Sequence, residues 1–159
     1  MKFLIPIDGS DLALQALQHV IALARGGLGV ELVLANVQEP ASVYELVTLH
    51  DPEALAEVAV AAGRDLLAPA LQAAEAARLP VASVVSVGDV VPMLLETLEE
   101  HGCEAVVMGS HGKGLVRSVL GSASREMLER APVPVTFVKP RPEPAEPAAA
   151  AEDVAADAD

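Results

Sequence analysis

The chain has few aromatic residues and few positive charges. It contains two Phe, one Tyr and no Trp in 159 residues, and its ten Lys and Arg stand against 23 Asp and Glu, a net charge of −13. Proteins that hold single-stranded nucleic acid stack its bases on aromatic side chains, and phosphate backbones attract basic surfaces. We therefore expect no nucleic-acid partner, and we expect any single base that binds to lie between aliphatic side chains.

Cysteine and long hydrophobic runs are also scarce. Cys103 is alone, so an intrachain disulfide is impossible and a reducing compartment is favoured. The apolar stretch after Lys2 is interrupted by Pro6 and ends at Asp8, which makes it too short for a signal-peptide core or a membrane span. The sequence predicts a cytoplasmic protein that has no membrane partner.

Apolar strands alternate with helical patterns over a length that suits one domain. The pattern predicts strands at 2–7, 30–37, 81–87, 104–108 and 133–138. Helices are predicted to begin after the capping residues Ser10, Asp51 and Asp89, and at Ser122, while Pro69 is expected to kink or divide the second helix. This alternation is typical of a parallel α/β sheet. Residues 140–159 are rich in Pro, Ala and acidic residues and are predicted to form a disordered tail.

The segment AVVMGSHGKGLVRSVLGS, residues 105–122, is rich in glycine. It joins the fourth strand to a helix that starts at Ser122, and the N-terminus of a helix favours an anion. The segment predicts a phosphate-binding loop, although the P-loop and dinucleotide patterns both fail here. The alternative is a surface loop whose glycines only supply positive φ angles.

The glycine spacing resembles the signature of the universal stress protein family, Gly-x2-Gly-x9-Gly-Ser/Thr, in its ATP-binding branch. Gly109, Gly112, Gly121 and Ser122 match its fixed positions, and the opening FLIPIDGSDLALQAL is similar to the family's first strand and helix. Eight residues separate Gly112 from Gly121 where the family pattern has nine. The shortened loop can either still reach phosphates or close the site.

The resemblance covers residues 1–139 and implies an open five-stranded parallel sheet of order 3-2-1-4-5 with helices on both faces. Such a sheet is Rossmann-like and similar to the adenine nucleotide alpha hydrolase fold. The resemblance also implies that Asp8 contacts the nucleotide, that the backbone of Val37 contacts the adenine and that Pro6 forms a wall of the pocket. A carboxylate such as that of Asp8 suits ribose hydroxyl groups, which donate hydrogen bonds. The full implied site consists of Pro6, Asp8, Val37, Met108, Gly109, His111, Gly112, Gly121 and Ser122. Its expected ligand is ATP or AMP, with or without magnesium.

The residues of the implied site also have purely structural interpretations. Asp8 can shape a strand–helix turn, Val37 can be a core residue and Pro6 can mark the end of a strand. His111 is expected to form hydrogen bonds within the loop, because no nucleophile with a positioned acid accompanies it. The four His residues fall on separate segments, so no metal site is expected.

The resemblance implies a regulatory protein of the stress response that binds nucleotide and forms a homodimer through its fifth strand, Val133 to Val138. One alternative is a weak ATPase or an autophosphorylating enzyme. That activity requires a positioned base and a metal, and Asp8 is the only candidate carboxylate in the expected crevice. We therefore predict no catalytic residue. The other alternative is a dimeric scaffold that holds no ligand.

Overall fold

The computed structural model describes residues 1–42, 51–112 and 120–140. Most of the predicted tail, residues 141–159, and most of the shortened glycine loop, residues 113–119, lie outside the described residues. The described residues include all five expected strands and all nine residues of the implied site.

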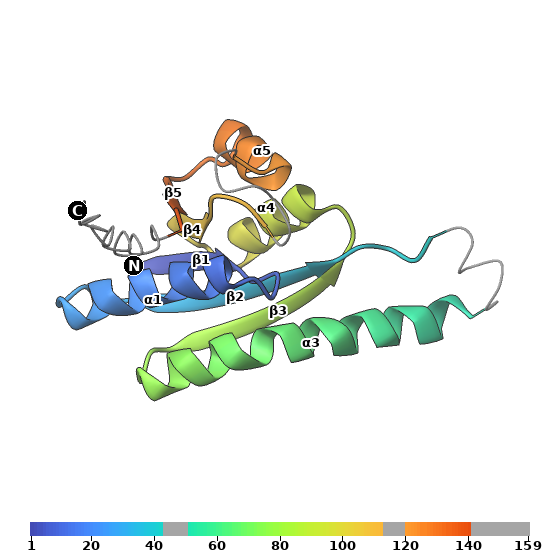
Figure 1. The fold of residues 1–159 in the computed structure, drawn as a ribbon, viewed down its shortest axis with the longest axis horizontal. Helices are drawn as coiled ribbons and strands as arrows, with labels where there is room; N and C mark the ends of the chain where they lie inside the picture. The colour runs from blue at the N-terminus through green and yellow to red at the C-terminus, as the bar shows by residue number, and fades with distance from the viewer. Residues whose placement is uncertain (43–50, 113–119, 141–159) are drawn as a thin grey trace, which may run out of the picture.

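The elements follow one another as strand and helix in alternation (Figure 1). Their bounds are β1 Lys2–Pro6, α1 Asp11–Arg25, β2 Glu31–Gln38, α3 Pro52–Ala76, β3 Val81–Val87, α4 Val90–Glu100, β4 Ala105–Gly109, α5 Ser122–Arg130 and β5 Val135–Val138. The strands form one parallel sheet in the order β3-β2-β1-β4-β5. The predicted fold class and strand order are therefore confirmed.

Two of the three predicted helix caps form as expected. The Ser10 hydroxyl accepts a hydrogen bond from the Ala13 N–H at 3.2 Å, and the Asp51 carboxylate accepts one from the Ala54 N–H at 3.0 Å. Asp89 stands at the N-cap of α4, but its side chain makes no capping bond. In the first two helices the donor is the third helical residue, and at this position α4 has Pro92, which carries no N–H. The prediction that Asp89 caps the helix is therefore wrong.

The helix α3 runs through Pro69 without a break. Proline removes the bond to the carbonyl of the residue four positions earlier, which is Asp65. Both Pro69 and Asp65 are exposed, so water can hydrate the freed carbonyl. The helix is therefore not divided at Pro69.

The sheet separates two apolar clusters. The helices α1 and α3 pack on one face, against alternate residues such as Ile5 and Leu34, and the helices α4 and α5 pack on the other, against residues such as Leu4 and Val33. In Figure 1, α3 lies below the sheet while α4 and α5 lie above it. Both faces are buried, which explains why the central strands read as nearly continuous apolar runs.

The order of the strands creates a crevice at the carboxyl end of β1. β1 pairs with β2 on one side and with β4 on the other. The chain therefore continues from β1 to the strands on one side of it, and only later adds β4 on the opposite side. Ligands of open α/β sheets bind at such switch points. Asp8, just after β1, and Gly109, at the end of β4, therefore lie at the same edge of the sheet.

Candidate functional site

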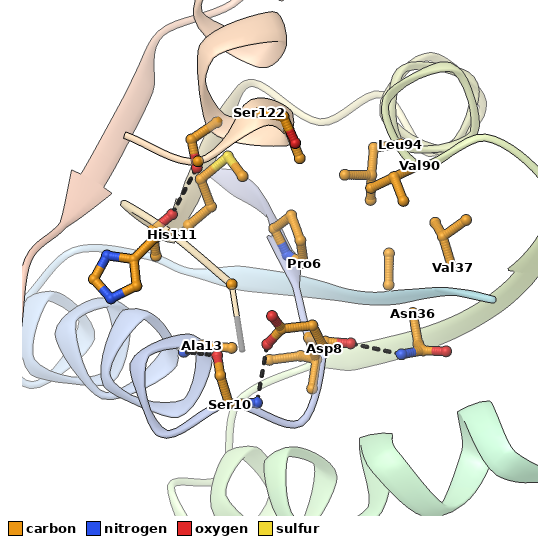
Figure 2. Close-up of a pocket in the computed structure, with 18 residues that line it drawn as sticks. Pro6, Asp8, Ser10, Ala13, Asn36, Val37, Val90, Leu94, His111 and Ser122 are labelled. Carbon is orange, nitrogen blue, oxygen red and sulfur yellow. Dashed lines mark hydrogen bonds between the residues drawn. The ribbon is translucent and has the colours of Figure 1, made fainter. Parts of the chain in front are cut away.

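A cavity of about 210 Å³ opens at this switch point (Figure 2). It is lined by the carboxyl ends of β1, β2 and β4, by the residues that follow β1 and β4, and by the N-terminal parts of α1, α4 and α5: Pro6, Ile7, Asp8, Ser10, Ala13, Ala35, Asn36, Val37, Val90, Leu94, Met108, Gly109, His111, Gly112, Gly121, Ser122, Ala123 and Ser124. The structure thus brings all nine sequence-predicted site residues together in one cavity.

One end of the cavity is apolar. Val37 from β2 lies close to Val90 and Leu94 from α4, with Pro6 beside them (Figure 2). Met108 adds a buried side chain from β4. These side chains can hold a flat apolar group between aliphatic surfaces, which suits a purine in a chain with only two Phe, one Tyr and no Trp.

The turn after β1 positions a carboxylate at the mouth of the cavity. The Asp8 carboxylate accepts a hydrogen bond from the Ser10 N–H at 2.9 Å, and Gly9 takes a left-handed φ of +78°. A Cβ added at Gly112 would lie 2.9 Å from the other Asp8 carboxylate oxygen. The exposed carboxylate and the backbone of the glycine loop therefore face each other across a short gap.

Packing leaves no room for a side chain at Gly109 or Gly112. Among the described glycines, positive φ angles occur in Gly9, Gly27, Gly88 and Gly102, none of which belongs to the glycine loop. A Cβ at Gly109 would lie 2.9 Å from the Leu12 Cγ on α1. The alternative that this loop needs glycine for its φ angles therefore does not hold for the described site glycines.

Hydrogen bonds join the end of β4 to the start of α5. The Gly121 N–H donates to the Ser110 carbonyl at 2.9 Å, and the buried Ser124 hydroxyl donates to the Gly109 carbonyl at 3.1 Å. Gly121 is the N-cap of α5 and has no side chain with which to cap it. The N–H groups of the first turn of α5 lack intrahelical partners, and Ser122 and Ser124 line the cavity. This end of the cavity can accept an anion.

His111 forms a contact within the loop, as predicted. Its Nδ1 lies 3.2 Å from the Ser110 hydroxyl. In Figure 2 its ring points away from the apolar end formed by Val37, Val90 and Leu94. Its position therefore favours a role in holding the loop over a contact with a base.

Sequence reasoning missed several lining residues, of which Asn36 is the most informative. Asn36 is 2% exposed, and its side-chain N–H donates to the Ile7 carbonyl at 2.7 Å. It is the one polar residue inside the otherwise apolar stretch from Leu32 to Val37, and that contrast was a usable signal. Ser124 and Leu94 carried no comparable signal, because their packing depends on distant elements.

The described residues hold no group of three or more His, Cys, Asp or Glu side chains arranged to bind a metal ion. None of the helices in the described ranges combines the length and apolarity that a membrane crossing requires.

Comparison with known proteins places this chain in a family. A sequence model of the universal stress protein family matches residues 1–139, so the chain belongs to the universal stress protein family. It is 29% identical over 139 residues to universal stress protein MJ0531 of Methanocaldococcus jannaschii, with 87% of this chain and 81% of that protein aligned.

Solved structures share the fold. The hypothetical protein MJ0577 superposes with a TM-score of 0.76 at 25% identity, over 89% of this chain and 97% of that one. A universal stress protein solved in complex with cAMP has a TM-score of 0.65 at 21% identity, over 87% and 96% of the two chains. A family protein from Arabidopsis thaliana solved with AMP bound has a TM-score of 0.63 at 16% identity, over 89% and 92%.

Proposed function

We propose that this protein binds an adenine nucleotide, AMP or ATP, in the cavity at the carboxyl ends of β1 and β4. The observation that carries the proposal is that one cavity joins an apolar end, at Val37 and Leu94, to the uncapped N-terminus of α5. Adenine fits the apolar end, and phosphates fit the N–H groups at Ser122. The cAMP and AMP complexes of two proteins with this fold support the proposal.

Asp8 is the residue that we propose to contact the ribose. It lines the cavity below Pro6 in Figure 2, and a carboxylate accepts hydrogen bonds from hydroxyl groups, whereas it repels phosphates unless a cation intervenes. In this proposal AMP binds without magnesium, and ATP binds with or without it.

The site is suited to binding more than to turnover. Phosphoryl transfer needs a positioned base or a water-orienting group beside the phosphate, together with a metal. Asp8 is the only carboxylate among the described residues that line the cavity, and it already accepts a bond from the Ser10 N–H. We therefore propose a regulatory protein of the stress response in the cytoplasm, in which the bound nucleotide changes the dimer or its partners.

Calorimetry with AMP and ATP tests the site directly. Gly121→Val should weaken ATP binding by at least about tenfold, roughly 1.4 kcal/mol, because Gly121 is the N-cap of α5 and lines the cavity, so that an added side chain crowds the phosphate end. The φ of −63° at Gly121 is open to any residue, so the fold should tolerate the change. Asp8→Ala should weaken AMP binding and leave any affinity for free phosphate unchanged.

Gly29→Val is the matched control. Gly29 is an exposed glycine far from the cavity, and an added Cβ meets no atom within 4 Å. This variant should bind ATP as the wild type does. Wild-type protein that takes up neither AMP nor ATP at millimolar concentration, with or without magnesium, would refute the proposal. The alternative that the protein is a dimeric scaffold that holds no ligand would then remain.

A further inference from the structure

The hydrogen bonds of β2 alternate strictly between its two neighbours. Toward β1, the Glu31 N–H donates to the Met1 carbonyl and the Ala35 carbonyl accepts from the Ile7 N–H. Toward β3, the Leu32 N–H donates to the Pro80 carbonyl and the Gln38 carbonyl accepts from the Gly88 N–H. Odd-numbered residues of β2 therefore direct their N–H and C=O groups toward β1, and even-numbered residues direct theirs toward β3.

By this alternation, the next bond after Ile7 N–H to Ala35 would join the Val37 N–H to the Ile7 carbonyl. Instead, the Ile7 carbonyl accepts from the Asn36 side chain at 2.7 Å. The Val37 N–H has no hydrogen-bond acceptor among the described residues. Because β1 ends at Pro6, both polar backbone groups of Val37 face the cavity at its apolar end.

The Asn36 side chain is held firmly in this arrangement. It is buried, and its oxygen accepts a bond from the Gln38 side chain at 2.6 Å. A Cβ at Gly63 on α3 would lie 2.7 Å from the same oxygen, so the helix leaves just enough room for the amide. The Ile7 carbonyl can only accept, which fixes the amide nitrogen as the atom that faces it.

We propose that Asn36 is a positioning residue that occupies the Ile7 carbonyl and so keeps the Val37 N–H and C=O available to read a purine base. This inference rests on the proposed nucleotide site, in which the family resemblance assigns the Val37 backbone to the adenine, and it adds the role of Asn36. A donor and an acceptor from one residue match the acceptor N1 and the donor N6 amino group of adenine. Hypoxanthine reverses both groups, with a donor at N1 and an acceptor at O6, so both contacts would become repulsive.

The first test needs no nucleotide. Amide hydrogen exchange of the wild-type protein, measured by NMR, should show Val37 exchanging at least tenfold faster than Ala35, whose N–H points toward β1 within the ladder. In Asn36→Leu the Ile7 carbonyl becomes available, and the Val37 N–H should gain protection. A Val37 amide as protected as Ala35 in the wild type, or equally unprotected in both proteins, would overturn the inference.

The second test compares AMP with inosine monophosphate by calorimetry. The wild type should prefer AMP by about tenfold or more, because a mismatched base leaves buried polar groups unpaired. In Asn36→Leu the preference should fall below about threefold, while affinity for tripolyphosphate stays unchanged. Unchanged base selectivity in Asn36→Leu would refute the role of Asn36.

Thr97→Val is the matched control. Thr97 is 3% exposed and donates to the Met93 carbonyl at 2.8 Å, so this change also removes a buried side-chain bond to a backbone carbonyl, but outside the cavity. It should keep the full preference for AMP. If the wild type binds no AMP, the proposed nucleotide function fails, and the exchange measurement still decides whether Asn36 keeps the Val37 amide unpaired.

Discussion

Gly63 on α3 offers the sharpest test of the packing beneath the site. A Cβ at this position would lie 2.5 Å from the Val85 Cγ1 and 2.7 Å from the Asn36 side-chain oxygen. Neither atom can move easily, because Val85 is a β-branched residue on β3 and Asn36 is held by two hydrogen bonds. The added methyl group therefore cannot be accommodated by a simple change of rotamer.

Two opposing terms set the size of the effect of Gly63→Ala. Replacing glycine inside a helix gains about 1 kcal/mol of helix propensity, and overpacking a dense core costs about 1–3 kcal/mol. Since both contacts are below 3.0 Å, we expect the cost to lie in the upper half of that range. Gly63→Ala should therefore lower the free energy of unfolding by about 1–2 kcal/mol.

Urea denaturation followed by circular dichroism measures this change, with an unchanged m-value expected. Ala62→Gly, at the neighbouring exposed position of α3, measures the helix term alone and should cost about 1 kcal/mol. If Gly63→Ala stabilises the protein by as much as Ala62→Gly destabilises it, the close approach of α3 to Asn36 is wrong.

Three further predictions concern the tail, the edge strand and the buried thiol. Deleting residues 141–159 should change the free energy of unfolding by less than about 1 kcal/mol, and a larger loss would show that the tail docks on the domain. The carbonyls of Pro134 and Val138 accept bonds from the N–H groups of Val106 and Ser110, so the Val135 N–H faces away from the sheet. Val135→Pro should convert a dimer to a monomer in light scattering, and a monomeric wild type or an unchanged dimer would refute pairing through β5. Burial raises the pKa of the Cys103 thiol, and the charge of Lys2 lowers it by less, so as the pH rises the thiol ionises first in the unfolded chain. The free energy of unfolding of the wild type relative to Cys103→Ala should therefore be constant below about pH 8.5 and fall above it. A difference between the two proteins that is independent of pH in urea titrations would contradict this.

Much of the fold was readable from local sequence. The strands and helices were predicted because apolar periodicity and capping residues act over a few positions. Ser10 and Asp51 cap as predicted, since the third residue of each helix has an N–H to donate. Asp89 fails for an equally local reason, the proline three positions later.

The candidate site was predicted by a different route. Its nine residues and the order of the strands came from resemblance to a family, and the structure brings all nine to one cavity. Whether that cavity takes a nucleotide stays a prediction. The shortened loop that bears most directly on it, residues 113–119, lies outside the described part of the chain.

The sequence by itself determined where strands and helices form, because those preferences depend on side chains and caps a few residues apart. Only the tertiary structure decided that Asn36 meets the Ile7 carbonyl across 29 positions and that Gly63 leaves room for it. Such contacts depend on which strands pair and how closely a helix packs. A polar residue in an apolar strand shows that a partner exists, and only the folded chain shows which partner it is.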